Sequence, residues 1–299
     1  MAQGVCRYAS IMNGARQVLF HHRIHKVFKQ HLVCISVWEK DKKGGNRKPY
    51  PVSHIEMIKD GLKMMGPEMK KFGDEMKHKF RADPFVNIND GDYEYIWKFN
   101  DRKRVEEWIV SSDHDNNEGQ SKANLTFSTN NTALFHGYLS QQVPKDGVVK
   151  RTGYCNIRSP TKFLSFKRED NHDWSCFTHL LMRVRGDGRP YMVTISMDRF
   201  FDINWFDQYH YTLFTRGGPY WQIAKIPFSK FYVTSKGRIQ DKQEPIQLER
   251  ITHLSITIGD GNEGPFYLEI DYIACMFDEN HKEAFAYESY VTDPAHVNT

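Results

Sequence analysis

The sequence predicts a mainly β protein: a jelly-roll β-sandwich that follows a short helical region and a disordered N-terminal presequence. Three observations predict this fold class. From about Tyr93 onward, apolar and polar residues alternate with a period of two, the spacing of a half-buried strand. Turn-forming residues separate ten such segments, and almost no helical pattern lies between them. Aromatic residues make up 14% of the chain, and flat rings pack well on pleated sheets.

The first 38 residues differ from the rest of the chain in charge. They contain five Lys or Arg residues and no Asp or Glu. Without them 36 basic residues face 37 acidic ones, so the net charge of +4 arises in this segment. An acid-free, basic N-terminus that can form an amphipathic helix is typical of a mitochondrial transit peptide, which we predict over residues 1–38. A basic disordered tail is the alternative. Residues 39–54 are charged and rich in Gly and Pro, which predicts a linker.

Residues 55–92 are predicted to form a helical N-terminal extension. Apolar residues recur at spacings of three and four from Ile55 to Phe80, and lysines lie beside this apolar stripe. Gly66 and Pro67 interrupt the stretch, and proline lacks the amide proton that a helix interior needs. We therefore expect two short helices that meet at this point. They could contact a partner helix or a membrane surface, or they could pack back on the edge of the sandwich.

The sandwich is predicted over residues 93–278, with a polar C-terminal tail over residues 279–299. One short helix is expected at Arg102–Ile109. The predicted strands are Tyr93–Asn100, Asn124–Thr129, Ala133–Ser140, Gly153–Arg158, Thr178–Arg185, Tyr191–Met197, His210–Thr215, Tyr220–Ile226, Thr252–Ile258 and Phe266–Phe277.

The stretch 180–197 contains the clearest turn signal. Two alternating segments flank the run Gly186-Asp-Gly-Arg-Pro190, and glycines accept the positive φ angles of a tight reversal. We therefore expect a β-hairpin here. In the last predicted strand, simple alternation places Tyr272 on the same side as Phe266, with Glu269 and Asp271 on the other side.

Composition excludes several classes of function. No apolar run approaches the roughly 20 residues that a transmembrane helix requires. The chain beyond its N-terminal segment is nearly neutral, which does not suit a nucleic-acid-binding surface. The five cysteines are widely scattered and include no CxxC pair, so the sequence predicts neither a disulfide framework nor a zinc or redox motif.

One loop contains the weak candidates for metal ligands. Asp113, Asp115 and Asn117 place oxygen atoms at alternate positions, as calcium-binding loops do. An EF-hand, however, requires Gly at its sixth position and Glu at its twelfth, where this loop has Glu118 and Asn124. An ordinary solvated turn is the alternative that we favour.

No catalytic motif connects the remaining polar residues. Glu269 and Asp271 could form an acid–base pair, but alternating charges on the solvent side of a strand are far commoner. An enzyme would need acids and histidines that converge in a pocket around Asp198–His210. The sequence contains neither GxSxG nor GxxxxGK[ST]. We predict no catalytic residue, no cofactor and no enzymatic activity.

Aromatic residues are concentrated between Phe200 and Trp221. Alternation would direct about half of these rings into the core. The candidates for an exposed, partner-binding platform are Trp205, Phe206, Tyr209 and Trp221. Large rings provide much of the binding energy at interfaces, so a protein partner would use such a platform as readily as a sugar.

Several segments resemble the complex I intermediate-associated protein 30 family. They are VRGDGRPYMVTI at Val184–Ile195, YWQIAKIPFSKF at Tyr220–Phe231, HLSITIGDGNEGPFYLEIDYI at His253–Ile273 and, more weakly, the strand at Phe135–Gly137. The loop from Asp113 to Ser121 is similar to the family's Asn-Asp…Gly-Gly-x-Ser segment, but it retains one glycine only, Gly119.

The resemblance implies a galactose-binding-like, carbohydrate-binding-module-like jelly roll. It also implies a non-enzymatic chaperone that acts in the assembly of respiratory complex I (NADH:ubiquinone oxidoreductase). Such a protein would lie in the mitochondrial matrix, peripherally at the inner membrane. Its partners would be membrane-arm assembly intermediates and other assembly factors, including an acyl-CoA-dehydrogenase-like flavoprotein. A glycan-binding module of the jelly-roll type is the alternative function.

Overall fold

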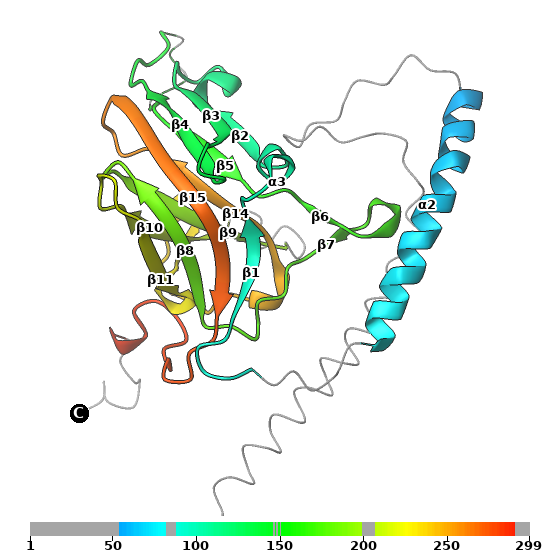
Figure 1. Cartoon of the computed structure of the whole chain (residues 1–299). Helices are drawn as coiled ribbons and strands as arrows, with labels where there is room; N and C mark the ends of the chain where they lie inside the picture. Colours follow the sequence, from blue (N-terminus) through cyan, green and yellow to red (C-terminus); the bar gives the residue numbers. More distant parts are fainter. Residues whose placement is uncertain are drawn as a thin grey trace, which may run out of the picture. The chain divides into compact units, whose positions relative to one another are not determined.

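The computed structural model describes residues 54–81, 88–145, 147, 149, 151–198 and 207–290. These residues belong to two compact units, which we describe separately. One contains helix α2 (His54–Arg81) as far as Phe80 together with the loop Leu164–Arg168, and the other contains the sandwich (Figure 1). The predicted transit peptide and nearly all of the predicted linker lie outside the described residues.

Helix α2 continues through Gly66 and Pro67, so the expectation of two short helices was wrong. Met65 and Met69 lie four residues apart on either side of the proline, which keeps the apolar stripe in phase across it. Pro67 itself is exposed, on the side of the helix opposite the stripe. The backbone hydrogen bond that the proline removes therefore lies where water can reach the freed carbonyl group.

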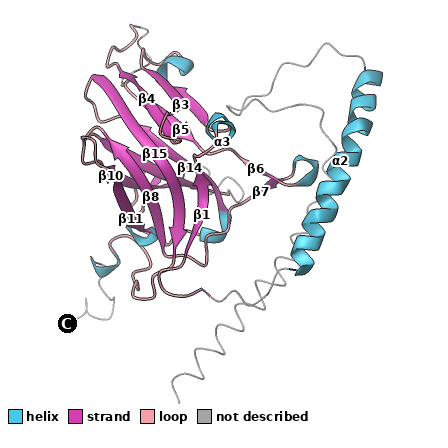
Figure 2. Cartoon of the chain, viewed as in Figure 1, coloured by secondary structure: helices cyan, strands magenta, loops and turns pink. Residues whose placement is uncertain are grey.

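Strands dominate the second unit, and they form two large antiparallel sheets (Figure 2). The first has six strands in the order β11-β8-β15-β4-β3, with β1 also paired to β15. Its strands are β1 (Tyr93–Lys98), β3 (Lys122–Phe127), β4 (Ala133–Leu139), β8 (His179–Gly186), β11 (Gln222–Pro227) and β15 (Gly264–Met276). The 13-residue β15 is long enough to pair with β4 along its first half and with β1 along its second.

The second sheet has seven strands in the order β13-β12-β10-β9-β14-β5-β2. They are β2 (Ile109–Ser112), β5 (Cys155–Arg158), β9 (Pro190–Met197), β10 (Asp207–Phe214), β12 (Tyr232–Ser235), β13 (Arg238–Ile239) and β14 (Ile251–Ile258). A separate pair consists of β6 (Lys162–Phe163) and β7 (Glu169–Asp170). The helical elements besides α2 are α3 (Arg102–Glu106), η1 (Asp113–Asn116), η2 (Ser165–Lys167), η3 (Phe228–Lys230), η4 (Leu248–Arg250) and η5 (Glu288–Tyr290).

The hydrophobic core lies between these two sheets and takes alternate side chains from each. In β15 the buried residues include Leu268 and Ile270, and in β9 they include Val193 and Ile195. Trp174, which is only 1% exposed, contacts this core from the segment before β8. The predicted fold class, a mainly β jelly-roll sandwich preceded by a helix, is confirmed.

The predicted hairpin at Gly186–Pro190 was wrong. Strand β8 belongs to the six-stranded sheet, whereas β9 pairs with β10 and β14 in the other sheet. The glycine-rich run is therefore a corner that crosses between the sheets. The carboxylate of Asp187 accepts hydrogen bonds there from the backbone N–H of Arg189 and from that of Tyr267 in β15, at 3.0 and 2.9 Å. Turn residues specified the reversal of the chain, but they did not specify which strands would pair.

Two other local expectations also need correction. Helix α3 ends at Glu106, and Ile109 instead begins β2, where it lies opposite Arg158 of β5. In β15 the register shifts between Ile270 and Tyr272 against β8, which marks a β-bulge. The extra residue reverses the alternation, so Tyr272 lies off the core side and packs edge-on against Tyr95.

Candidate functional site

The candidate site is the side of the six-stranded sheet that faces away from the core. Glu269 lies opposite Arg185 on one neighbouring strand and Leu134 on the other, while Arg183 lies opposite Ile223. Paired residues on antiparallel strands point to the same side of a sheet. We call this surface the outer face. Its residues are Leu134, His136 and Tyr138 of β4, Arg183 and Arg185 of β8, Ile223 and Lys225 of β11, and Tyr267, Glu269 and Asp271 of β15.

Glu269 is at the centre of the outer face and is nearly buried, with 3% of its surface exposed. Its carboxylate accepts hydrogen bonds from the Thr132 hydroxyl at 2.5 Å, from the Asn130 amide at 3.0 Å and from Nε of Arg185 at 2.9 Å. Burial alone would raise the pKa of Glu269. The bonds from Thr132, Asn130 and Arg185 outweigh that effect and lower the pKa below its ordinary value.

A second ion pair, between Arg183 and Asp271, lies on the neighbouring part of the same face. Both arginines also contact the indole of Trp221, with guanidinium carbons 4.7 Å (Arg183) and 5.1 Å (Arg185) from the ring centroid. These distances fit cation–π contacts. The half-buried Trp221 thus helps to fix the two arginines, which fixes the alternation of positive and negative charge across the face.

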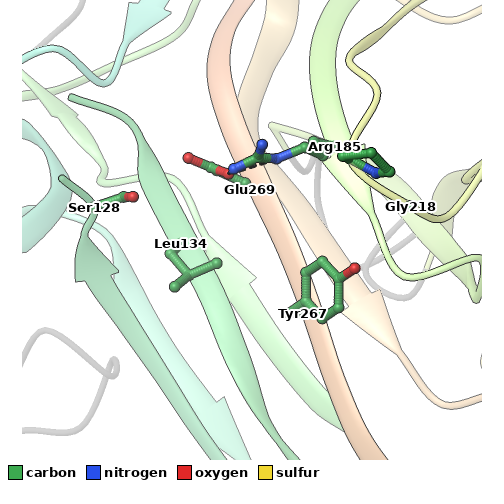
Figure 3. A pocket seen from close by; sticks show the side chains of 7 residues that line it. Ser128, Leu134, Arg185, Gly218, Tyr267 and Glu269 are labelled. Carbon is green, nitrogen blue, oxygen red and sulfur yellow. Dashed lines mark hydrogen bonds and ion pairs between the residues drawn. The ribbon is translucent and has the colours of Figure 1, made fainter. Parts of the chain in front are cut away.

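Around the Glu269–Arg185 pair the outer face is hollowed into an open cavity of about 490 Å³. In Figure 3 the side chain of Arg185 extends to Glu269, and Ser128 and Gly218 lie on opposite sides of this pair. Tyr267, which is 42% exposed, adds an aromatic ring to the cavity. The lining residues are Ser128, Leu134, Arg185, Gly218, Pro219, Tyr267 and Glu269.

This arrangement suits recognition better than catalysis. Both carboxylates are paired with arginines, and the lowered pKa of Glu269 keeps its side chain ionised at neutral pH. A general acid or base would instead need a pKa near neutrality and an open path to substrate. What the face offers is fixed charge of both signs, an exposed tyrosine and apolar positions such as Ile223, which is 61% exposed. Those are properties of a surface that binds a polar or protein ligand.

The four aromatic residues predicted to bind a partner have different positions. Trp205 and Phe206 lie outside the described residues. Tyr209 is 3% exposed and packs in the core, with its hydroxyl donating to the carbonyl of Pro245 at 3.1 Å. The prediction that Tyr209 is exposed was therefore wrong, because its side chain points to the core side of β10. Of the two predicted aromatic residues that the structure describes, Trp221 contributes to the outer face, through its contacts with Arg183 and Arg185.

The candidate metal loop is a structural turn. The buried carboxylate of Asp113 accepts hydrogen bonds from the backbone N–H and hydroxyl of Ser121, at 2.8 and 2.9 Å, and from the backbone N–H of Gly153 at 2.8 Å. Asp115 accepts from the backbone N–H of Ser112 at 3.0 Å and caps η1, while Asn117 ends η1 in the left-handed conformation. Within the described residues no group of three His, Cys, Asp or Glu side chains could hold a metal ion.

The region around Asp198–His210, which an enzyme would need, does not form a convergent site in its described part. His210 is buried and its ring lies 2.8 Å from the Thr194 hydroxyl. Asp198 accepts a hydrogen bond from the Asn171 amide at 3.3 Å and lies 3.6 Å from Arg250. Each side chain therefore has a separate local role.

Sequence reasoning did not find the Arg183–Arg185–Trp221 group. The signal was present, because arginines alternate with apolar residues in β8 just as acids do in β15. Complementary charges at alternating positions on two strands predict cross-strand pairs, but only if the strands are known to be neighbours. The incorrect hairpin assigned β8 to the wrong neighbour.

Comparison with known proteins places this chain in a family. The model of the complex I intermediate-associated protein 30 family matches residues 97–270. The chain belongs to the complex I intermediate-associated protein 30 family. Its sequence is 42% identical over 295 residues to the Drosophila melanogaster protein named complex I intermediate-associated protein 30, mitochondrial, covering 98% of this chain and 96% of that protein. It is 39% identical over 241 residues to the Mus musculus protein of the same name, covering 80% of this chain and 69% of that protein.

A Caenorhabditis elegans protein named probable complex I intermediate-associated protein 30, mitochondrial, is 40% identical over 206 residues, which cover 69% of this chain and 60% of that protein. Among solved structures, the family 11 carbohydrate-binding module from Clostridium thermocellum in complex with a mixed-linked tetrasaccharide is 14% identical, with a TM-score of 0.43. That alignment covers 64% of this chain and 99% of the module.

Among the described residues, we find no helix whose length and apolar content would let it span a bilayer.

Proposed function

We propose that this chain is an assembly factor for mitochondrial respiratory complex I and that it acts as a chaperone, without catalysing a reaction. Family membership is the observation that carries the proposal, because relatives that are 42% and 39% identical are named as associated with complex I intermediates. Those relatives are also named mitochondrial. The acid-free, basic first 38 residues of this chain support the same compartment.

The finer parts of the proposal concern location and partners. The protein acts in the matrix, peripherally at the inner membrane, and holds incomplete membrane-arm modules until further subunits join them. Other assembly factors, including an acyl-CoA-dehydrogenase-like flavoprotein, bind in the same assembly intermediates. No cofactor and no metal ion take part.

The outer face is the surface proposed to hold the assembly intermediate. It combines the rigid charges of Arg183, Arg185 and Glu269 with the exposed side chains of Ile223 and Tyr267. A chaperone for a membrane-arm module needs affinity for surfaces that the mature enzyme later buries. Exposed apolar positions beside fixed charges can supply that affinity together with orientation.

The proposal is tested by depletion and rescue. The native protein is depleted, tagged variants are re-expressed, and detergent-solubilised mitochondria are separated on native gels with mass spectrometry of each band. Wild-type protein should migrate with incomplete complex I, be absent from the mature enzyme and restore the mature enzyme. A free protein, together with normal complex I after depletion, would show that the proposed function is wrong.

Two isoleucines provide a matched pair of variants for the outer face. Ile223 of β11 is 61% exposed on that face, and Ile239 of β13, in the other sheet, is 64% exposed. Ile223→Glu should lower co-migration with incomplete complex I by about tenfold or more, since burying an unpaired charge in an interface is costly. Ile239→Glu should behave as wild type. If both variants rescue equally, the surface is assigned wrongly while the assembly role stands.

A glycan-binding module is the second candidate function, and the cavity on the outer face is the observation that favours it. Tyr267 provides a ring on which a sugar could stack, and Arg185 and Glu269 provide hydrogen-bonding groups beside it. The test is a glycan array with wild-type protein and Tyr267→Ala. Binding that the variant loses would support this function, whereas no binding by wild type would exclude it for the sugars on the array.

A further inference from the structure

Helix α2 carries different chemistry on its two flanks. With about 100° of rotation per residue, Glu68 and Glu75 lie on one flank of the apolar stripe. Lys59, Lys63, Lys70 and Lys77 lie on the opposite flank. The four lysines are all exposed, and they follow one another at spacings of four, seven and seven residues. Such spacing gives a single row along the helix.

The acidic flank already has a partner within its own unit. Glu75 accepts hydrogen bonds from the backbone N–H of Ser165 at 2.5 Å and from Nη2 of Arg168 at 2.6 Å. Glu68 accepts from the backbone N–H of Phe166 at 2.6 Å. The acidic flank of α2 is therefore occupied by the loop Leu164–Arg168, and the helix is not free to turn that flank elsewhere without breaking these bonds.

The stripe and the basic flank are exposed. Ile58, Leu62, Met65 and Met69 are 64%, 61%, 41% and 55% exposed. No Asp or Glu lies between this part of the stripe and the lysine row, since the intervening positions are Gly66 and Gly73. An apolar stripe bordered by a continuous row of lysines is thus the surface that α2 presents.

We propose that this surface of α2 lies on the headgroup layer of an anionic bilayer. Lysines beside an apolar stripe can extend their ammonium groups to lipid phosphates while the stripe enters the boundary between headgroups and acyl chains. From Lys59 to Lys77 the row extends about 27 Å along the helix axis. Charge distributed along such a length matches a continuous anionic surface better than a single acidic site on a protein. The inference rests on the proposed inner-membrane location and names the segment that produces it.

The test measures binding of the full-length protein to vesicles by co-sedimentation. One set of vesicles is pure phosphatidylcholine, and in the other about one lipid in five is anionic phosphatidylglycerol. Wild-type protein should bind the anionic vesicles and bind the neutral vesicles much more weakly. Replacement of Lys59, Lys63, Lys70 and Lys77 by Gln should weaken binding to the anionic vesicles at least about tenfold, because each lysine near such a surface contributes to binding. Glutamine keeps a good helix propensity, and circular dichroism checks that α2 still forms.

The basic N-terminal segment makes a charge-matched control necessary. Lys103, Lys145, Lys236 and Lys242 are exposed on the second unit. Their replacement by Gln removes the same charge and should leave vesicle binding unchanged. For the stripe, Leu62→Asn with Met69→Asn should also weaken binding, whereas Ile239→Asn with Phe214→Asn should not.

Three outcomes would overturn the inference: equal binding to both kinds of vesicle, equal loss from the lysine variant and its charge-matched control, or no binding by wild type. If wild type does not bind vesicles but the lysine variant loses complex I intermediates on native gels, α2 binds an acidic protein surface instead. Failure of the proposed function would give a different result: the protein would still bind anionic vesicles, but its depletion would leave complex I normal.

Discussion

Asp113 is a single buried carboxylate that joins three backbone segments, and it shows how a residue chosen as a metal ligand can be structural instead. Its partners Ser121 and Gly153 come from the loops before β3 and β5. Each hydrogen bond to an ionised carboxylate contributes more than a neutral one. The carboxylate of Asp113 therefore holds the loop closed through bonds to Ser121 and Gly153.

Gly119 is required beside this carboxylate because a Cβ atom at position 119 would overlap the Asp113 side chain. We predict that Gly119→Ala lowers the free energy of unfolding by about 1–3 kcal/mol, the usual cost of overpacking a well-packed site. Chemical denaturation measures the change. The control is Gly61→Ala in α2, where a Cβ meets no atom within 4 Å, and no loss of stability is expected. If Gly119→Ala is as stable as wild type, the Asp113 loop adapts and is not a fixed structural centre.

At the scale of elements, helix α2 stabilises the conformation of the loop Leu164–Arg168. Phe166 and Lys167 have φ angles of 57° and 52°, a left-handed conformation that side chains other than glycine adopt at a cost. Glu75 offsets that cost through its bonds to Ser165 and Arg168. We predict that Glu75→Gln increases hydrogen exchange at the Ser165 amide, which donates to this carboxylate, about tenfold, because a charge-assisted bond contributes roughly 1.5–3 kcal/mol.

Hydrogen-exchange mass spectrometry measures this effect, and Asp74→Asn is the matched control. Asp74 is 63% exposed, and its carboxylate forms an ion pair with Lys77 at 3.5 Å within the helix. Its replacement should leave exchange in the loop unchanged. Equal protection in wild type and Glu75→Gln would mean that the loop holds its conformation without α2.

The elements also show how far the sequence could be interpreted. Period-two alternation located strands such as β9 and β14 to within a residue or two, because burial on one side of a sheet leaves a local pattern. The pairing of β8 with β11 and β15 depends on contacts between distant segments. The Gly-rich corner at Gly186–Pro190 does not indicate which strands β8 pairs with. The bulge at Asp271 likewise depended on register, so Tyr272 was placed on the wrong side. The outer face is therefore a property of pairing, which alternation alone does not determine.

At the scale of the whole molecule, three histidines connect stability to pH. Burial lowers the pKa of His172, of His179 and of His210 to about 4 in each case. Their ordinary value, which applies in the unfolded chain, is 6.5. Between these values the unfolded chain binds protons that the folded protein does not, so stability falls as the pH decreases. Asp260 does not contribute in this range. Burial would raise its pKa, but hydrogen bonds from Arg189 and Asn262 lower it to about 2.

We therefore predict that the melting temperature falls as the pH decreases from about 6.5 to about 4, and that His210→Gln makes this decrease shallower. The ring of His210 lies 2.8 Å from the Thr194 hydroxyl in the core, and glutamine can keep a hydrogen bond there without binding a proton. Thermal unfolding at a series of pH values measures the slope. The same replacement at the exposed His78 should keep the wild-type slope. An unchanged slope in His210→Gln would assign the acid sensitivity to other groups, and the half-buried His172 and the buried His179 would be tested next in the same way.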